Sequence, residues 1–303
     1  MKLGYIGLGK MGKNMVMNMV DHGHEVVAWN RSPAPLDEVV NYGAKRASTL
    51  EDMLGQVSAP RVVWVMLTAG EVTEDMLFGA HALVDKLTPG DILIDGGNSN
   101  FNDSKRRGEM CAAKGIHFLD VGTSGGPLGA RTGACLMIGG PREAYEKLVP
   151  LFESISIKDG FQYVGDAGAG HYVKMVHNAV EYGFMQAMGE GFEMIKSGPY
   201  KNLDLVDVSR IWNNGSVIES KLMRLAEAAF REDKTLETIE GYVEDNGESQ
   251  WTIETALQHK VPVTVLAHSL FARYRSRQEE SFAMKVVAIL RKQFGGHAVK
   301  EKN

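Results

Sequence analysis

The stretch of sequence that decides the fold is KLGYIGLGKMG, residues 2–12. Its first part, Lys2–Gly7, is mostly apolar and predicts a buried β-strand. A loop with the spacing G-x-G-x-x-G follows, completed by Gly9 and Gly12, and an apolar-periodic helix runs to about His22. Glycines at this spacing let the backbone approach a pyrophosphate, and the helix N-terminus favours its negative charge. The stretch therefore predicts a dinucleotide-binding strand, loop and helix.

The next predicted strand, Glu25–Trp29, carries the second half of this signature. It ends in Asn30, Arg31 and Ser32, about 20 residues after the loop, where an NAD enzyme usually has Asp or Glu. A neutral Asn30 would not repel a 2′-phosphate, and Arg31 and Ser32 could bind one. These residues favour NADP as the cofactor, with NAD possible. Alternatively, Ser32 only caps the helix beginning near Pro33, and Arg31 points to water.

Strands and helices alternate along the first 166 residues. Further strands are expected at residues 61–67, 91–95, 117–121, 135–138 and 162–164, and helices at 72–86, 101–114 and 141–152. This alternation predicts a doubly wound, Rossmann-type parallel sheet as a domain over residues 1–166, with ligands at the carboxyl ends of the strands. The residues expected to contact the cofactor are Gly7, Gly9, Lys10, Met11, Gly12, Asn30, Arg31, Ser32, Met66, Leu67 and Asn98.

Two loops at this edge of the predicted sheet are rich in glycine and polar residues. Asp95–Ser99 contains Asn98, and Gly122–Arg131 contains Ser124. Both can present an amide, a hydroxyl and backbone N–H groups to a polyhydroxylated, anionic substrate. The same residue types also occupy ordinary turns.

From about Ala167 onward the pattern is helical. Ala167–Ser197 would form a helix about 45 Å long, too long for one small domain. We therefore expect it to join the first domain to a smaller all-helical domain over residues 167–303 and to lie across the cleft between them. Further helices are expected at residues 204–212, 220–230, 251–258, 262–277 and 281–294, and a tail at residues 295–303.

One face of this long helix combines five different polar side chains. Counting from Lys174, the residues His177, Asn178, Glu181 and Tyr182 fall at helical spacing. A solvated face usually repeats Lys and Glu, whereas this face carries an amine, an imidazole, an amide, a carboxylate and a phenol. The mixture indicates an active site.

The composition is that of an ordinary globular chain. With a net charge of -5 and a pI near 6.0, the chain lacks the basic field that nucleic acids or anionic membranes attract. It has no apolar run of about 20 residues and no room for a signal peptide before the first strand, so we expect a cytoplasmic protein without membrane partners. Cys111 and Cys135 lack the spacing of a metal site or a disulfide framework.

Three motifs together resemble one family closely. They are the Asp95–Ser99 loop, the Lys174–Asn178 run with its following Glu and Tyr, and the C-terminal Arg291-x-x-Phe294-Gly295-x-His297. Over nearly its whole length the chain resembles the decarboxylating 6-phosphogluconate dehydrogenases of the β-hydroxyacid dehydrogenase superfamily, in their short-chain form. The resemblance implies NADP-dependent oxidation and decarboxylation of 6-phosphogluconate to ribulose 5-phosphate, as in the pentose phosphate pathway or gluconate utilisation.

The side-chain chemistry agrees with this reaction. Lys174 could accept the C3 hydroxyl proton and then, once protonated, stabilise the enolate oxygen during decarboxylation without a metal. Glu181 could protonate C1, while His177 and Asn178 hold hydroxyl and carboxylate groups. The residues expected to bind substrate are Asn98, Ser124, Gly125, Gly126, Tyr182, Gln250, Thr252, Arg273, Arg291 and His297.

The chain departs from the family pattern at the phosphate site. Gln250 stands where long-chain members have lysine, so phosphate binding depends more on Arg273, Thr252, Tyr182 and, by the family pattern, Arg291. In the family the C-terminal Arg and His come from a neighbouring subunit, so Arg291 and His297 imply a homodimer, possibly a tetramer.

Two other functions remain open. A non-decarboxylating β-hydroxyacid dehydrogenase, such as one acting on 3-hydroxyisobutyrate, shares the glycine loop and the lysine, but it has no carbanion for Glu181 to protonate. A non-catalytic NADP-binding module would not need Lys174.

Overall fold

The computed structural model describes residues 1–301 and contains two units, Met1–His177 and Asn178–Asn303. Helix α9 (Ala169–Ser197) begins in the first unit and continues in the second. The first unit therefore extends beyond the boundary at residue 166 that the sequence predicts. The last two residues of the predicted second domain, 302 and 303, lie outside the described residues.

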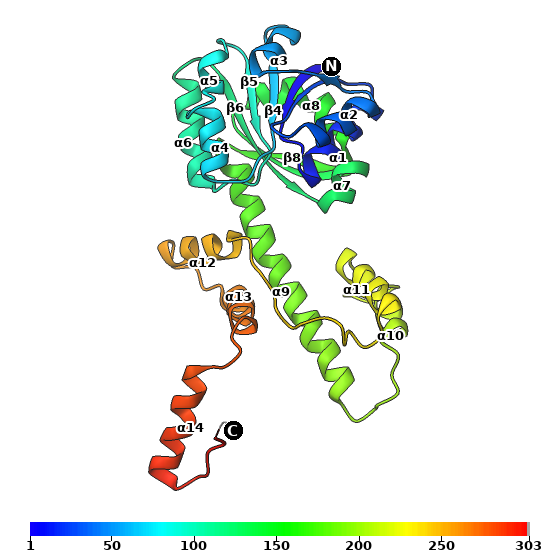
Figure 1. Cartoon of the computed structure of the whole chain (residues 1–303), viewed down its shortest axis with the longest axis vertical. Coiled ribbons are helices and arrows are strands. Elements are labelled where there is room, and N and C mark those ends of the chain that lie inside the picture. Colours follow the sequence, from blue (N-terminus) through cyan, green and yellow to red (C-terminus); the bar gives the residue numbers. More distant parts are fainter. Residues whose placement is uncertain (302–303) are drawn as a thin grey trace. The chain divides into compact units, whose positions relative to one another are not determined.

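The first unit is built on one eight-stranded sheet (Figure 1). Its strands are β1 (Lys2–Ile6), β2 (Glu25–Trp29), β3 (Lys45–Arg46), β4 (Val62–Val65), β5 (Ile92–Asp95), β6 (His117–Ser124), β7 (Ala134–Gly139) and β8 (Ser156–Gly165). Their order in the sheet is β3-β2-β1-β4-β5-β6-β7-β8. Because β2 and β4 lie on opposite sides of β1 and pair with it in parallel, the predicted doubly wound fold is confirmed.

The sequence pattern predicts a sheet that is parallel throughout, but one pair of neighbouring strands is antiparallel. β7 runs antiparallel to β6, with Asp120 opposite Gly139 and Ser124 opposite Cys135. Only residues 125–133 separate the two strands, and a parallel crossover needs a dozen residues or more. The short connection therefore returns the chain in the opposite direction.

Helices cover both faces of the sheet. They are α1 (Lys10–Asp21), α2 (Pro33–Tyr42), α3 (Leu50–Gln56), α4 (Glu71–Leu77), α5 (Leu83–Lys86), α6 (Phe101–Ala112), α7 (Gly126–Thr132) and α8 (Arg142–Ile155). Figure 1 shows α4, α5 and α6 on one side of the sheet and α1, α7 and α8 on the other. Alternate strand residues enter two apolar clusters, so that Tyr5 belongs to one and Ile6 to the other. The sheet is thus buried on both faces.

Several local predictions were wrong. The helix expected over residues 72–86 is interrupted between α4 and α5, where Ala82 has a positive φ of 44°. The loop expected over residues 122–131 contains β6 up to Ser124 and then α7. The strand β3 and the helix α3 were not predicted, because both are short.

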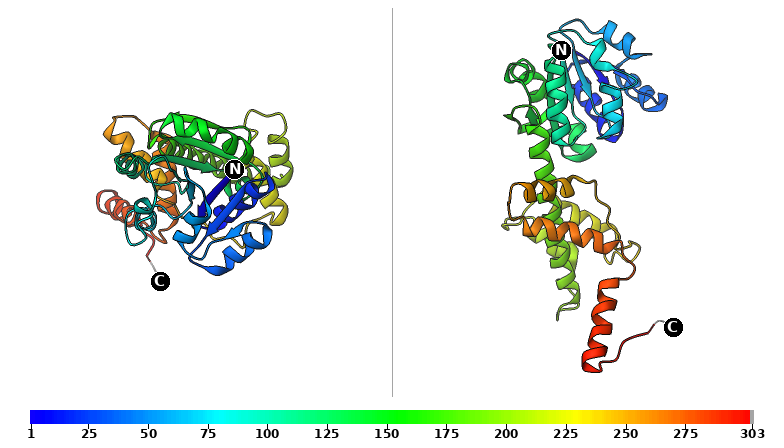
Figure 2. Two further views of the ribbon diagram at one scale, coloured as in Figure 1. Left: turned by 90° about the horizontal axis from the view of Figure 1, so that it is seen from above. Right: turned by 90° about the vertical axis from the view of Figure 1, so that its left-hand side faces the viewer.

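The second unit is entirely helical in its described part. After α9 come α10 (Leu205–Trp212), α11 (Lys221–Glu232), α12 (Glu248–Gln258), α13 (Thr264–Ser276) and α14 (Phe282–Gly295). A small core around Phe192, Met223 and Phe230 joins α9, α10 and α11. In Figures 1 and 2, α14 (red) extends away from α12 and α13.

Candidate active site

Three side chains of the first unit form one hydrogen-bonded chain at the start of α9. Lys174 Nζ lies 3.4 Å from His177 Nδ1, and His177 Nε2 lies 3.3 Å from Ser124 Oγ. Lys174 is buried, with 5% of its surface exposed, and the other two are half-buried. If the Lys174 amine donates one of its hydrogens to Nδ1, the ring proton sits on Nε2 and can be donated to the serine hydroxyl. The imidazole thus orients Lys174 and connects it to a second proton-carrying group.

Glycines let α9 lie directly on the sheet. A Cβ added to Gly122 in β6 would lie 2.4 Å from the Cβ of Lys174. A Cβ added to Gly170 in α9 would lie 2.3 Å from the carbonyl oxygen of Asp120. Both distances are far below van der Waals contact, so a larger residue would displace the backbone. This close approach holds Lys174 against β6.

Asp120 anchors the first turn of α9. Its buried carboxylate accepts hydrogen bonds from the backbone N–H groups of Gly168, at 2.7 Å, and His171, at 2.8 Å. A negative charge at a helix N-terminus also interacts favourably with the helix dipole. Sequence reasoning missed Asp120, although an acidic residue inside the apolar strand His117–Val121 is a signal that could have identified it. The carboxylate positions the turn that leads to Lys174.

Asn98 joins the two polar loops. Its Oδ1 accepts a hydrogen bond from the backbone N–H of Thr123 at 2.9 Å, and its Nδ2 donates to the Thr123 carbonyl at 3.2 Å. The residue after Thr123 is Ser124, and Gly125 and Gly126 follow at the N-terminus of α7. The amide of Asn98 therefore supports the Ser124 loop, and its contact with substrate or cofactor stays a prediction.

A buried arginine holds the Asp95–Ser99 loop. Arg107 Nη1 lies 3.1 Å from Asp95 Oδ2 and 3.0 Å from Ser99 Oγ, and its Nε lies 3.0 Å from Glu74 Oε2. Burying a guanidinium is tolerable only with such complete pairing. Arg107 was missed because one arginine in an amphipathic helix carries no distinguishing pattern.

The glycine loop leaves space where a pyrophosphate would lie. A Cβ on Gly7 would lie 2.3 Å from the Met66 carbonyl oxygen, and one on Gly12 would lie 2.0 Å from the Gly7 carbonyl oxygen. In contrast, no atom lies within 4 Å of a Cβ on Gly9, the N-cap of α1. The first turn of α1, which includes Lys10 and Met11, contains no acidic residue, so its N–H groups can receive a phosphate. The residues fit a dinucleotide cofactor.

A pocket of about 460 Å³ opens beside this loop, among the ends of β1 and β2, the loop after β4, and α4. Of the predicted cofactor residues, Gly7, Asn30, Arg31, Ser32 and Leu67 line it. Asn30 accepts a hydrogen bond from the Leu8 N–H at 3.0 Å and donates to the Ser32 carbonyl at 2.9 Å. Ser32 occupies the N-cap position of α2 without a side-chain capping bond, which leaves its hydroxyl for a ligand.

Asn178 and Tyr182 belong to a polar network of the second unit. Asn178 donates a short hydrogen bond to the carboxylate of Glu248, and both residues are buried. Tyr182 donates to Asn246 Oδ1 at 3.1 Å, and Asn246 Nδ2 donates to Glu248 at 3.3 Å. Asn246 and Glu248 were missed, because polar residues before a helix are also typical of ordinary loops.

Arg273 lies over the ring of Tyr182. Its guanidinium carbon is 3.5 Å from the ring centroid, and its Nη1 donates to the Glu244 carbonyl at 2.8 Å. Such a stack is a cation–π contact. Burial raises the pKa of Tyr182, so the phenol remains a neutral donor. The structure thus brings together two residues predicted to bind phosphate.

The other predicted substrate residues of the second unit are placed differently. Thr252 is buried and donates its hydroxyl to the Glu248 carbonyl one turn earlier, at 3.0 Å. Gln250 is exposed and donates to Glu254 at 2.8 Å. Thr252 is therefore used within its own helix, and its contact with phosphate stays a prediction.

The catalytic role of Glu181 and the substrate contacts of Arg291 and His297 stay predictions as well. Glu181 is half-buried on α9, Arg291 is exposed on α14, and His297 follows that helix. Over residues 1–301, no hydrogen bond joins Arg291 to Tyr182. In the same part of the chain no helix is long and apolar enough to cross a membrane.

Both parts of the chain match known families. Residues 2–165 match the family described as the NAD binding domain of 6-phosphogluconate dehydrogenase. Residues 170–302 match the family described as the C-terminal domain of 6-phosphogluconate dehydrogenase.

Individual relatives are similar over the whole chain. The Bacillus subtilis protein YqeC, whose name assigns it provisionally to the 6-phosphogluconate dehydrogenases, is 45% identical over 302 residues. The NAD(+)-dependent, decarboxylating 6-phosphogluconate dehydrogenase of Haloferax volcanii is 42% identical over 309 residues. Both comparisons cover 100% of each protein. The solved 6-phosphogluconate dehydrogenase of Plasmodium falciparum has a TM-score of 0.84 at 28% identity, covering 100% of this chain and 66% of that one.

Proposed function

The chain belongs to the 6-phosphogluconate dehydrogenase family, and from that premise we propose that it catalyses the oxidative decarboxylation of 6-phosphogluconate to ribulose 5-phosphate and CO2. The observation that carries the proposal is the buried Lys174, hydrogen-bonded to His177 and through it linked to Ser124. An amine held in this way can take a proton from a substrate hydroxyl and later return it. The bound nicotinamide cofactor, NADP or NAD, supplies the acceptor for the hydride.

Lys174 acts in two successive steps. It first accepts the proton of the C3 hydroxyl while the hydrogen on C3 leaves as hydride, and the product is a β-keto acid. The protonated amine then stabilises the negative charge that develops on the keto oxygen as CO2 departs. His177 keeps the amine oriented in both steps, because its Nδ1 lies 3.4 Å from the amine nitrogen.

Glu181 is the proposed general acid. Loss of CO2 leaves an enediol whose C1 carbon needs a proton, and a simple hydroxyacid oxidation has no such step. Glu181 follows Lys174 on α9 by two turns and is half-buried, so it can deliver a proton without being fully exposed to water. Asn178 holds a substrate hydroxyl, and its own orientation is set by Glu248.

Arg273 and Tyr182 are the proposed phosphate site. The guanidinium is fixed by its stack on the ring and by the Glu244 carbonyl, which leaves other N–H groups for an anion. The Tyr182 hydroxyl donates its single proton to Asn246 Oδ1, so a direct bond to the phosphate requires this proton to be redirected. Gln250 contributes no charge, so within one copy of the chain the phosphate depends on Arg273 for its ionic contact.

The decisive experiment is anaerobic turnover of 6-phosphogluconate labelled in its C1 carboxylate, with reduced cofactor and labelled CO2 measured in one sample. Equal amounts of the two products are expected. Reduced cofactor without CO2 would instead identify a non-decarboxylating β-hydroxyacid dehydrogenase. Glu181→Gln should lower the turnover rate by about 100-fold or more, whereas Glu153→Gln, at an exposed carboxylate of α8, should leave it unchanged.

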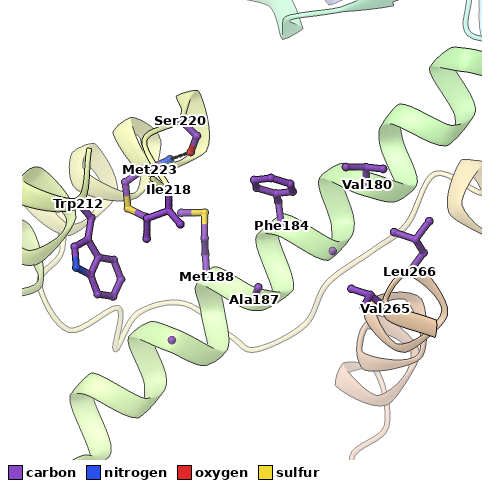
Figure 3. A pocket seen from close by; sticks show the side chains of 12 residues that line it. Val180, Phe184, Ala187, Met188, Trp212, Ile218, Ser220, Met223, Val265 and Leu266 are labelled. Atoms are coloured by element: carbon purple, nitrogen blue, oxygen red, sulfur yellow. Dashed lines mark hydrogen bonds between the residues drawn. The ribbon is translucent and has the colours of Figure 1, made fainter. Parts of the chain in front are cut away.

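A second copy of the chain is the proposed partner. α14 exposes apolar side chains along its length, with exposed fractions from 38% for Val286 to 79% for Phe282. The second unit also has an apolar groove of about 490 Å³ along α9, flanked by α11 and α13 and lined by Phe184, Met188 and Leu266 among others (Figure 3). Soluble monomers rarely leave two such surfaces uncovered.

Charge supports α14 of a second copy as the occupant of this groove. α14 carries Lys285, Arg291 and Lys292 and no acidic residue, whereas α9 carries Glu190 and Glu193 beside the groove-lining residues. In this pairing the apolar face of α14 would enter the groove, and its basic side chains would lie near Glu190 and Glu193.

Light scattering after gel filtration tests this dimer. Ile289→Asp in α14 and Phe184→Asp in the groove should each give monomers, because each would place a charge in the apolar contact. Met194→Asp, at an exposed position of α9 outside the groove, should leave the dimer intact. A monomeric unsubstituted chain, or dimers that survive both substitutions, would contradict the proposal.

A further inference from the structure

The pocket beside the glycine loop contains charges of both signs. Arg31 lines it from the end of β2, and α4 contributes the carboxylates of Glu71 and Asp75. His81 lies at its margin, where its ring packs edge-on against Trp29 at 5.8 Å between centroids. Among the Asp, Glu, Lys and Arg side chains that line this pocket, the two carboxylates outnumber the single guanidinium.

These two carboxylates are not neutralised by basic side chains. Over residues 1–301, neither Glu71 nor Asp75 forms an ion pair with Lys or Arg; Asp75 only accepts the Ala80 N–H at 2.9 Å and lies 4.0 Å from His81. Glu74 on the same helix differs, because Arg106 binds it at 2.7 Å. On α4, Glu74 is therefore paired with Arg106 of α6, whereas Glu71 and Asp75 line the pocket without a Lys or Arg partner.

Arg31 is similarly uncompensated within the described chain. No ion pair or hydrogen bond to a protein group occupies its guanidinium over residues 1–301, so it is available to an anionic ligand. Ser32 beside it has an unused capping hydroxyl. A 2′-phosphate in this pocket would thus be attracted by one guanidinium and repelled by two carboxylates. An uncharged 2′-hydroxyl would interact only weakly with these three charges.

We propose that Glu71 and Asp75 determine cofactor choice, by opposing the 2′-phosphate that Arg31 attracts and so allowing NAD to compete with NADP. The inference rests on the proposed function only in placing the adenosine end of the cofactor in this pocket. A 2′-phosphate carries close to two negative charges at neutral pH, so each carboxylate in the same solvated pocket should weaken NADP binding about three- to tenfold.

Calorimetric titration of the full-length protein with each cofactor, without substrate, tests the proposal. Glu71→Gln and Asp75→Asn should each lower the Kd for NADP by about three- to tenfold and change the Kd for NAD by less than about twofold. Glu153→Gln removes the same charge from an exposed position of α8 and should change neither Kd. The gain for NADP should shrink at high salt, because the repulsion is screened.

The possible results separate this inference from the proposed function. Equal changes for NAD and NADP, or no change in either variant, would overturn the inference while the proposed function stands. Binding of neither cofactor to the unsubstituted protein would overturn both. Arg31→Gln should have the opposite effect on affinity, weakening the binding of NADP and leaving that of NAD unchanged. An equal loss of affinity for both cofactors would show that the charges in this pocket do not select between them.

Discussion

Replacing Asp120 by Asn tests how the start of α9 is held. The carboxylate accepts one hydrogen bond at each oxygen, from Gly168 and His171. In the variant the amide oxygen can keep one of these donors, but the amide nitrogen faces the other. A buried N–H without an acceptor costs about 1–3 kcal/mol, and replacing a charge-assisted bond by a neutral one costs about 1 kcal/mol more. We therefore expect a loss of about 2–4 kcal/mol.

The thermal unfolding temperature gives the assay. At about 2–4 °C per kcal/mol for a unit of this size, Asp120→Asn should lower the Tm by about 5–15 °C. Asp85→Asn makes the same chemical change in an exposed ion pair with Lys114 and should cost less than about 1 kcal/mol. Turnover by the folded Asp120 variant should also fall, because its first α9 turn no longer holds Lys174 in place. A Tm decrease no larger than that of Asp85→Asn would refute the anchoring role.

Three further predictions concern single side chains. Lys174→Met should lower turnover by about 100-fold or more without changing the cofactor Kd, and calorimetry would reveal any loss of binding. The hydrogen bond from Arg106 holds the pKa of Glu74 below its ordinary 4.5, so its stabilising contribution is present above that pH and is lost as the pH falls through the lower folded pKa. The Tm of the unsubstituted protein should accordingly fall more steeply in acid than that of Glu74→Gln; parallel curves would contradict this. Burial raises the pKa of Cys111 to about 12, so iodoacetamide near neutral pH should alkylate it at least about tenfold more slowly than the half-buried Cys135. Mass spectrometry measures both alkylation rates, and equal rates would contradict the prediction.

The central strands could be predicted because their residues are buried on both faces. Val62–Val65, for example, is apolar throughout and lies between two core clusters. The direction of β7 could not be predicted from hydrophobicity, because an antiparallel strand buried on both faces has the same pattern as a parallel one. Likewise, the glycines before and within α7 are typical of a loop, so the sequence pattern does not indicate this helix.

The site was predictable to the extent that it depends on spacing along one helix. Lys174 and His177 are three residues apart on α9, and their contact follows from helical geometry. The contact between His177 and Ser124 joins segments far apart in the chain, so no local pattern contains it. Buried charges such as Arg107 and Glu248 have the same limitation, because only their partners distinguish them from surface residues.

The glycines of this chain differ in whether they tolerate a side chain, and this difference can guide the design of a more stable variant. At Gly122, even one methyl group would collide with the helix that carries Lys174. Gly55 in α3 and Gly189 in α9 have nothing within 4 Å of an added Cβ. Alanine there would remove backbone freedom from the unfolded chain and stabilise each helix by up to about 1 kcal/mol. A thermostable variant could therefore begin at these two glycines, while saturation libraries should exclude Gly122.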